Sequence, residues 1–254
     1  MRPKKHSGKL VHICCRKMIS QADLKRIASL GQTKYRQKYA QFLVEGRKGV
    51  EEVFHSKLQI DTILATSEFC NQFQPQYPYE LITTKEMKRL SQFVTPPGVI
   101  AGVNKFKSED TALENGLNIV LDGISDPGNL GAIMRIADWY GLSKIWLSED
   151  CVDETNPKVI ASSMGSFTRV ECFRAVDEIW QKAKYIWGAD LNGVSIYEID
   201  PPKEPFVLIM GSESHGIRES FAKKLTNRLT IPKRGHAESL NVAVSTGIIV
   251  DRLV

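Results

Sequence analysis

Three segments in the second half of the chain constrain its fold more than any other feature. Each joins an apolar run of strand length to a loop rich in Gly, Ser, Asn or Pro, and then to a stretch of helical period. They are residues 118–141 (NIVLDGISDPGNLGAIMRIADWYG), 206–217 (FVLIMGSESHGI) and 229–248 (LTIPKRGHAESLNVAVSTGI). This succession is typical of an α/β domain whose loops gather at one sheet edge. Because ligands bind at that edge, the three loops form the candidate functional site.

The second half as a whole alternates between strand and helix patterns. We expect strands at residues 118–121, 144–147, 170–173, 185–189, 206–210 and 228–231, and helices after Asn129, after Asn156, around Ile179, from about Arg218 and from Ser239. Such alternation predicts an α/β class with a mostly parallel sheet and helices on both faces.

A smaller α/β unit is expected before this domain. Its patterns predict an amphipathic helix over residues 20–30 and strands at 42–44, 60–65 and 99–103. A second helix is expected after Gly46 to about His55, and a third near residues 85–90. Residues 108–116 (SEDTALENG) are polar and end in two helix breakers, so we place a linker there. The chain is long enough for two domains, bounded at 18–107 and 117–254. Residues 1–17 are expected to be a disordered leader, because Met18 is a more natural start.

The composition is that of an ordinary globular chain. Hydrophobic residues make up 42% and charged residues 25%, and no apolar run approaches the length of a membrane span. The N-terminal apolar patch is too short for a signal-peptide core, so we expect a cytoplasmic protein.

The five cysteines are scattered and contain no CxxC pair, which argues for reduced thiols. The spacing of Cys14 and Cys15 with His6 and His12 matches no common metal pattern, so no metal is expected.

Positive charge is concentrated in the first half of the chain. Residues 1–110 carry 19 Lys and Arg against 10 Asp and Glu, a balance of +9, whereas residues 111–254 carry 15 against 19, a balance of −4. A basic front half suggests that the first part holds a polyanion while the second does the chemistry. A solvated basic surface explains the charge equally well.

Taken together and in this order, the three segments resemble the signature motifs of the SpoU (TrmH-like) branch of the SPOUT RNA methyltransferases. The resemblance covers residues 118–254 and implies a trefoil-knotted α/β domain that forms homodimers, binds S-adenosyl-L-methionine and methylates a ribose 2′-hydroxyl in RNA. Residues 42–53 (FLVEGRKGVEEV) and 95–106 (TPPGVIAGVNKF) look like the first and last parts of the small ribosomal-protein-like α/β domain that precedes such catalytic domains. That domain favours ribosomal RNA over transfer RNA as the substrate.

The resemblance assigns roles to residues in the three loops. It places the catalytic residues at Asn129, Arg135, Glu213, Ser239 and Asn241, with Arg135 as the activator of the ribose hydroxyl. It places the cofactor cradle at Gly211, Ile231, Leu240 and Ser239. Structural alternatives stay open: Arg135 could pair with Asp138 on the surface, Glu213 could be an N-cap or first-turn acid, and Ser239 could cap the last helix. The sulfonium methyl group is already activated, so the reaction needs no metal.

The front domain supplies candidate contacts to RNA. The candidate phosphate ligands are Lys34, Arg36, Lys38, Arg47 and Lys48, and Tyr35 or Tyr39 could stack on bases. A plain surface or core role is the alternative for each of them.

The last helix bears on oligomeric state. Residues Val242, Val244, Ile248, Ile249 and Leu253 make it apolar over more than one face, which favours a subunit interface.

Two rival functions come from other classes. A non-catalytic RNA-binding protein of ribosome assembly would be expected to lose several of the five catalytic residues, which are all present. A nucleotide-binding oxidoreductase would need the glycine spacing GxGxxG, which residues 211–216 (GSESHG) do not have.

Overall fold

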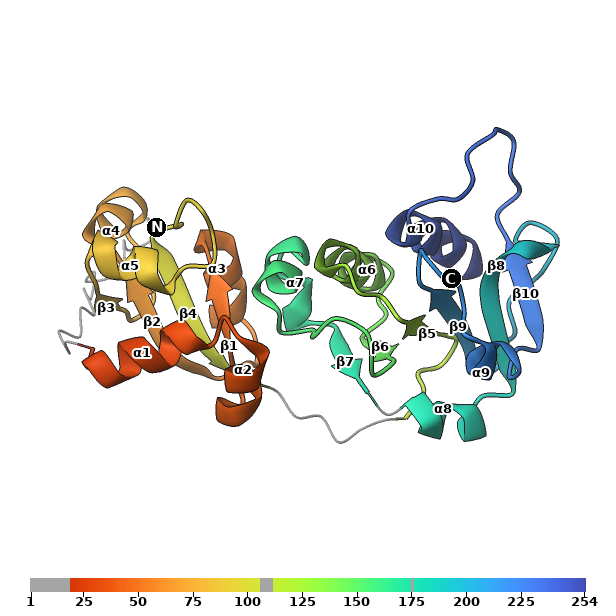
Figure 1. Cartoon of the computed structure of the whole chain (residues 1–254), viewed down its shortest axis with the longest axis horizontal. Coiled ribbons are helices and arrows are strands. Elements are labelled where there is room, and N and C mark those ends of the chain that lie inside the picture. The colour runs from red at the N-terminus through yellow and green to blue at the C-terminus, as the bar shows by residue number, and fades with distance from the viewer. Residues whose placement is uncertain (1–18, 106–111, 175) are drawn as a thin grey trace, which may run out of the picture.

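The computed structural model describes residues 19–105, 112–174 and 176–254. Within these ranges the chain forms two α/β units that lie side by side (Figure 1). The expected leader at 1–17 and the first part of the expected linker, 108–111, lie outside the described residues.

The first unit is a four-stranded sheet between two layers of helices. Its strand order is β1-β4-β2-β3, in which β4 runs antiparallel to β1 and β2, and β3 runs parallel to β2. The strands are β1 (Gln41–Glu45), β2 (Ile60–Ala65), β3 (Glu80–Leu81) and β4 (Val99–Asn104), and the helices are α1 (Gln21–Ser29), α2 (Thr33–Tyr39), α3 (Arg47–Phe54), α4 (Ser67–Phe73) and α5 (Thr84–Leu90). The expected helix over 20–30 is confirmed, with Ser20 as its N-cap.

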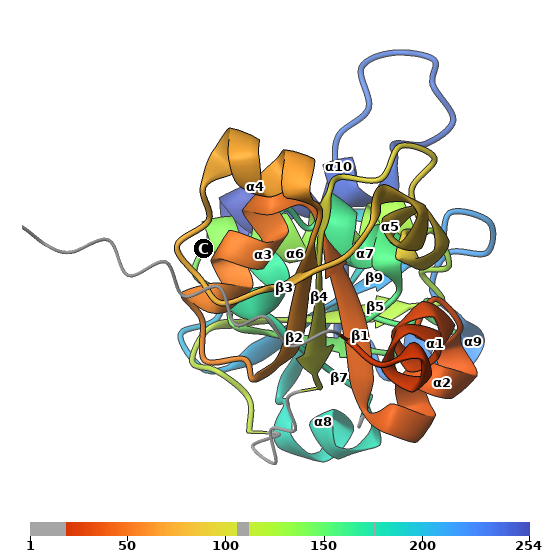
Figure 2. The same cartoon turned by 90° about the vertical axis from the view of Figure 1, so that its left-hand side faces the viewer.

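Alternation along β1 explains the two layers. Phe42 and Val44 face the apolar cluster that α3 and α4 complete, whereas Leu43 faces the cluster of α1 and α5. Because successive side chains of a strand point to opposite faces, one apolar run serves two cores. Figure 2 shows α3 and α4 together and apart from α1.

The second unit is a six-stranded sheet in which every recorded pairing is parallel. Its order is β10-β8-β9-β5-β6-β7. The strands are β5 (Leu117–Asp122), β6 (Lys144–Leu147), β7 (Glu171–Phe173), β8 (Tyr185–Ser195), β9 (Phe206–Gly211) and β10 (Asn227–Thr230). The helices are α6 (Pro127–Trp139), α7 (Pro157–Ser162), α8 (Val176–Lys182), α9 (Glu219–Ala222) and α10 (Val242–Leu253), with a 3₁₀ turn at Ser166–Thr168.

Both faces of this sheet are covered, as the alternating pattern predicts. On one face, Ile119 and Leu121 of β5 join a cluster with α6 and α10. Val120 points the other way, into a cluster with Ile179 of α8 and with the region of α9. The strand order reverses between β5 and β9, and such switch points open a crevice at the carboxyl edge of a parallel sheet.

Several elements differ from the sequence expectation. In the first unit, α2, α4 and β3 were not expected. In the second unit, two elements have other bounds. Strand β8 continues to Ser195, beyond the expected end at 189, because its last residues pair with β10 after a shift in register. The last helix begins at Val242 and its N-cap is Asn241, so the expected start at Ser239 is wrong. No helix in the described ranges is long and apolar enough to cross a membrane.

The two units share an apolar contact. Ile160 of α7 and Phe167 of the 3₁₀ turn pack into the α3 and α4 core of the first unit. The ring of Phe167 meets that of Phe42 edge to face, with centroids 6.0 Å apart. The second unit therefore helps to complete a core of the first, which fixes their relative position at this contact.

Candidate active site

Side chains from all three signature loops meet in one hydrogen-bonded cluster. Asn129 Nδ2 donates to Glu213 Oε1 at 2.7 Å. Asn241 Nδ2 donates to Asn129 Oδ1 at 2.9 Å and to Glu213 Oε1 at 3.2 Å. The loops therefore converge at the carboxyl edge of the sheet, and three of the expected catalytic residues lie together. Glu213 is bound by two amide groups and does not act as a helix cap.

Two helix starts hold these amides in place. The Asp126 side chain caps α6 by accepting from Asn129 N at 2.8 Å, and Pro127 occupies the first turn. The Asn241 side chain caps α10, since Oδ1 accepts from Ala243 N at 3.0 Å and from Val244 N at 3.3 Å. Because Asn241 Oδ1 accepts from the helix backbone, it is Nδ2 that donates to Asn129 and Glu213. Asn241 rather than Ser239 is thus the cap.

Arg135 lies on α6 with an exposed side chain. Within the described part of the chain it makes no hydrogen bond or ion pair. The alternative pairing with Asp138 is wrong, because Asp138 accepts from Arg169 Nη2 at 2.9 Å and from Ser166 Oγ at 2.8 Å. Burial tends to raise the pKa of Asp138, but these hydrogen bonds outweigh it and lower that pKa. Arg135 is left available to an external anion.

The expected cofactor residues lie on two segments. Gly211 ends β9 where the loop folds back, with Ser212 and Gly216 exchanging backbone hydrogen bonds of 3.1 and 2.9 Å. A Cβ at Gly211 would overlap the Gly216 carbonyl group, so only glycine fits. Ile231 is half-buried, whereas Ser239 and Leu240 are exposed next to Asn241. Among the described residues, the Ser239 side chain makes no hydrogen bond to Asn129, Glu213 or Asn241.

Sequence reasoning missed a second polar group at the same edge. Asp122, buried at the end of β5, accepts from Arg218 N at 2.7 Å and also from Arg218 Nε. Arg218 Nη2 pairs with Asp150 and lies 3.2 Å from Ser148 Oγ. The loops after β5, β6 and β9 are therefore tied together. The signal was available in the sequence, because Asp122 is the first acid after a buried strand.

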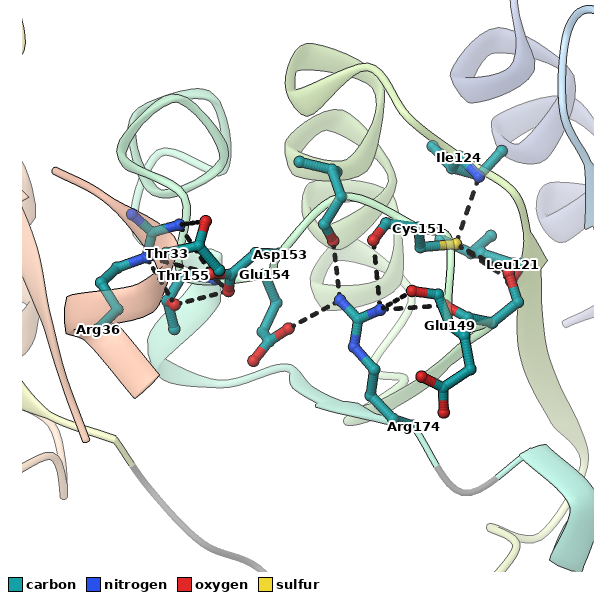
Figure 3. A network of polar contacts seen from close by, with 12 residues as sticks. Thr33, Arg36, Leu121, Ile124, Glu149, Cys151, Asp153, Glu154, Thr155 and Arg174 are labelled. Carbon is teal, nitrogen blue, oxygen red and sulfur yellow. Dashed lines mark hydrogen bonds and ion pairs between the residues drawn. The ribbon is translucent and has the colours of Figure 1, made fainter. Parts of the chain in front are cut away.

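Arg36 is not an RNA contact, contrary to the sequence expectation. Its side chain is only 1% exposed. It donates to Asp153 Oδ2 from Nη2 at 2.7 Å and to Thr155 Oγ1 from Nε at 3.3 Å (Figure 3). Burial of the guanidinium against an acid of the second unit removes it from any RNA surface.

A second arginine binds the loop that carries Asp153 (Figure 3). Arg174 Nη1 donates to the carbonyl oxygens of Ser148, Glu149 and Cys151 at 3.0 to 3.2 Å, and Nη2 donates to Glu154 Oε2 at 3.2 Å. Loop carbonyls of this kind need donors because no strand supplies them. Arg174 therefore shapes the segment from β6 to α7.

The other expected RNA contacts are on the surface. Lys34, Lys38, Arg47 and Lys48 are exposed. Arg47 pairs with Glu51 at 2.8 Å. The rings of Tyr35 and Tyr39 stack on each other with centroids 6.3 Å apart, and Lys34 and Lys38 lie over them.

The comparisons with known proteins identify the second unit. The model of the SpoU rRNA methylase family matches residues 116–251. The chain belongs to the SpoU rRNA methylase family. A further model, the MRM3-like substrate binding domain, matches residues 21–101. The family that the sequence motifs resemble is thereby confirmed.

Relatives of this SpoU chain match it over most of its length. The 23S rRNA (guanosine(2553)-2′-O)-methyltransferase RlmP of Bacillus subtilis (strain 168) is 33% identical over 232 residues, which are 87% of this chain and 91% of the relative. A solved TrmH-family structure from Porphyromonas gingivalis is 33% identical with a TM-score of 0.80, covering 93% of this chain and 98% of that one. The AdoMet-bound rRNA methyltransferase of Sinorhizobium meliloti is 28% identical with a TM-score of 0.80, covering 93% and 97%.

The residues of this SpoU chain suit S-adenosyl-L-methionine. Residues 232–240 are exposed, and within the described ranges their backbone groups make no hydrogen bond to other backbone. Free backbone donors and acceptors match the edge of an adenine base, and Leu240, 47% exposed, offers an apolar contact. Among the described residues no group of three or more His, Cys, Asp or Glu could hold a metal ion.

Proposed function

We propose that this protein transfers a methyl group from S-adenosyl-L-methionine to a ribose 2′-hydroxyl of ribosomal RNA. The observation that carries the proposal is the cluster of Asn129, Glu213 and Asn241, which draws on all three signature loops of a SpoU-family chain. Ribosomal RNA is favoured as substrate by the B. subtilis relative, whose name specifies 23S rRNA.

The cofactor cradle follows from the same loops. Gly211, Ile231, Leu240 and Ser239 would hold S-adenosyl-L-methionine, which supplies a methyl group on a sulfonium already activated for attack. The Asn129 cluster holds the loop after β9 against the starts of α6 and α10, so that the cradle and the catalytic residues keep a fixed relation. Positioning of this kind is a large part of catalysis between two bound reactants.

Arg135 acts on the ribose. A guanidinium stays protonated at neutral pH and is therefore a poor general base. Instead Arg135 fixes a phosphate of the RNA and stabilises the negative charge that develops on the 2′-oxygen. Its lack of any partner among the described residues supports this role. Glu213 has only one oxygen bound by the two amides, so the other is available to a hydroxyl of the substrate.

The front unit docks the RNA. We assign residues 18–107 to a substrate-binding domain of ribosomal-protein-like fold, 108–116 to a linker and 117–254 to the methyltransferase domain. The basic balance of the first 110 residues and the match to a substrate binding domain support this assignment. Lys34, Lys38, Arg47 and Lys48 are the proposed phosphate contacts.

Two further properties complete the proposal. The methyltransferase domain contains a trefoil knot, as the SpoU resemblance implies. The protein pairs as a homodimer through α6 and α10, where Trp139 is 84% and Val244 is 52% exposed. Apolar side chains as exposed as these are often covered by a partner surface, which favours an interface here.

Labelled methyl transfer tests the reaction. The protein and labelled S-adenosyl-L-methionine are incubated with total RNA, precursor RNA and assembled subunits from cells that lack the protein, and the RNA is digested to nucleosides. The expected product is a labelled 2′-O-methylnucleoside from ribosomal RNA. Label found in transfer RNA would show that transfer RNA, and not ribosomal RNA, is the substrate. Binding of both cofactor and RNA without label in any fraction would instead identify a non-catalytic assembly factor.

A further inference from the structure

The first unit has a hollow on its surface, separate from the loops described above. It lies between α3 and the turn that follows α4, which are seen together in Figure 2, and its volume is about 470 Å³. Its lining includes Arg47, Lys48, Phe54, Phe73 and Tyr77. This volume lies within the range of about 300 to 1,000 Å³ that is usual for small-molecule sites.

Aromatic rings form much of this hollow. Phe54 is 39% and Phe73 is 37% exposed, so both present a ring to an incoming group. The Arg47 guanidinium lies over the Phe73 ring, 4.9 Å from its centroid, and the Phe54 ring lies 5.5 Å from that of Tyr77. Aromatic faces with an adjoining guanidinium are the surface on which proteins stack unpaired bases.

The charges around the hollow suit an anionic ligand. Its two carboxylates are already paired, Glu51 with Arg47 at 2.8 Å and Glu52 with Arg169 at 2.7 Å. Lys48 makes no ion pair within the described part of the chain and is exposed. The free charge at the rim is therefore positive, as contact with a phosphate requires.

Tyr77 is the most buried aromatic residue that lines the hollow. It is 5% exposed, and its hydroxyl has no hydrogen-bond partner among the described residues. The hydroxyl itself has almost no exposed surface, so Tyr77 contributes its ring, and not its hydroxyl, to the hollow.

We propose that the hollow binds one unpaired base of the RNA substrate, stacked on Phe54 or Phe73, with the adjoining phosphate on Arg47 and Lys48. The inference rests on the proposed function and deepens it: the enzyme recognises a single-stranded nucleotide away from the ribose that it methylates.

The test compares full-length variants on two RNA probes. The first is a fluorescent single-stranded oligonucleotide from ribosomal RNA, and the second is the same strand fully paired. Phe54→Ala and Phe73→Ala are each expected to weaken binding of the single strand about 5- to 100-fold, as loss of one stacked base does. Binding of the duplex and of S-adenosyl-L-methionine stays unchanged. Phe54→Leu keeps apolar bulk but removes the aromatic face, so it separates stacking from folding.

Phe93→Ala is the matched control, since Phe93 is also 39% exposed but does not line the hollow. Equal effects of Phe54→Ala and Phe93→Ala, or no effect of the hollow variants, would overturn the inference. If those variants bind RNA normally but lose association with ribosomal subunits, the hollow serves a protein partner and the inference is also wrong. In either case methyl transfer by the wild type would leave the proposed function standing. Loss of single-strand binding in the variants of a protein that transfers no methyl group would overturn only the proposed function.

Discussion

Arg36 and Asp153 form a buried ion pair that joins the two units of the chain. Asp153 Oδ2 accepts from Arg36 Nη2 at 2.7 Å and from Nε at 3.1 Å. Nη1 donates to the carbonyl oxygens of Leu30 and Gly31, and Nη2 also donates to Thr33 Oγ1, so all N–H groups of the guanidinium are used. A residue that sequence places on an RNA surface is in fact an internal connection.

Arg36→Ala is expected to lower the free energy of unfolding by about 3 kcal/mol, because it leaves the Asp153 carboxylate, 16% exposed, with Lys105 Nζ at 3.9 Å as its remaining cation. Urea titration followed by tryptophan fluorescence measures the loss. Lys34→Ala on the exposed face of the same helix is the control, with an expected change of about 0.5 kcal/mol or less. Similar values for the two variants would show that the ion pair does not stabilise the fold.

Glu213→Ala is expected to reduce the rate of methyl transfer about 100-fold. The substitution leaves the amides of Asn129 and Asn241 without their shared acceptor, so the loop after β9 is no longer held against the starts of α6 and α10. Small displacements of reacting groups cost rates of this order. Single-turnover methylation measures the effect. Glu219→Ala, an exposed acid of the next helix, is the control. Full activity of Glu213→Ala would show that the hydrogen-bonded cluster of Asn129, Glu213 and Asn241 does not contribute to methyl transfer.

Arg135→Ala is expected to lower turnover about 100- to 1000-fold while the affinity for S-adenosyl-L-methionine is retained, since in the proposed mechanism the charge acts on the developing oxyanion. Stability should not change, because the side chain is exposed and has no partner in the described ranges. Calorimetric cofactor titration beside the rate assay separates the two effects. Arg135→Lys keeps the charge but not the planar fork and should recover only part of the rate. Undiminished turnover would disprove the role.

The sequence predicts the second unit well because its strands are buried on both faces. Apolar runs such as 206–210 stand out from their polar loops, and β9 covers that run with one residue more, Gly211. The cluster of Asn129, Glu213 and Asn241 was predictable as a gathering of loops, because the carboxyl ends of parallel strands share an edge. What sequence does not contain is the pairing of side chains within that edge.

Long-range partners account for the failures. In sequence, Arg36 lies between Lys34 and Lys38 and looks like another basic residue of the surface. Its contact with Asp153, which is far along the chain, buries it. Asp138 was the nearest partner in sequence for Arg135, but Arg169 reaches it instead. Ser239 and Asn241 are both good N-caps, and the choice of Asn241 depends on where the chain meets α6.

Two glycines in helices should respond oppositely to alanine. A Cβ at Gly131 would overlap Ser162 Oγ and lie 2.8 Å from Ser163 N, so α6 and α7 could not stay this close. Gly131→Ala is expected to destabilise the protein by about 1 to 3 kcal/mol. At Gly247 the nearest atom, Ile136 Cδ1, is 3.5 Å away, so Gly247→Ala should stabilise by about 0.5 to 1 kcal/mol. Thermal unfolding of both variants checks the signs, and a stable Gly131→Ala would contradict the close packing.

Tyr77→Phe should change how stability depends on alkaline pH. Burial raises the pKa of Tyr77 to about 12, with a smaller contribution from Glu51, while an unfolded tyrosine ionises near pH 10. Between these values the unfolded chain releases a proton that the folded chain keeps, so rising pH favours unfolding. The wild type should therefore lose on the order of 2 kcal/mol relative to Tyr77→Phe between about pH 10 and pH 12. Urea titrations of both proteins across this window measure the difference. Tyr197→Phe, at an exposed tyrosine, is the control, and parallel curves for wild type and Tyr77→Phe would show that the Tyr77 hydroxyl ionises freely in the folded protein.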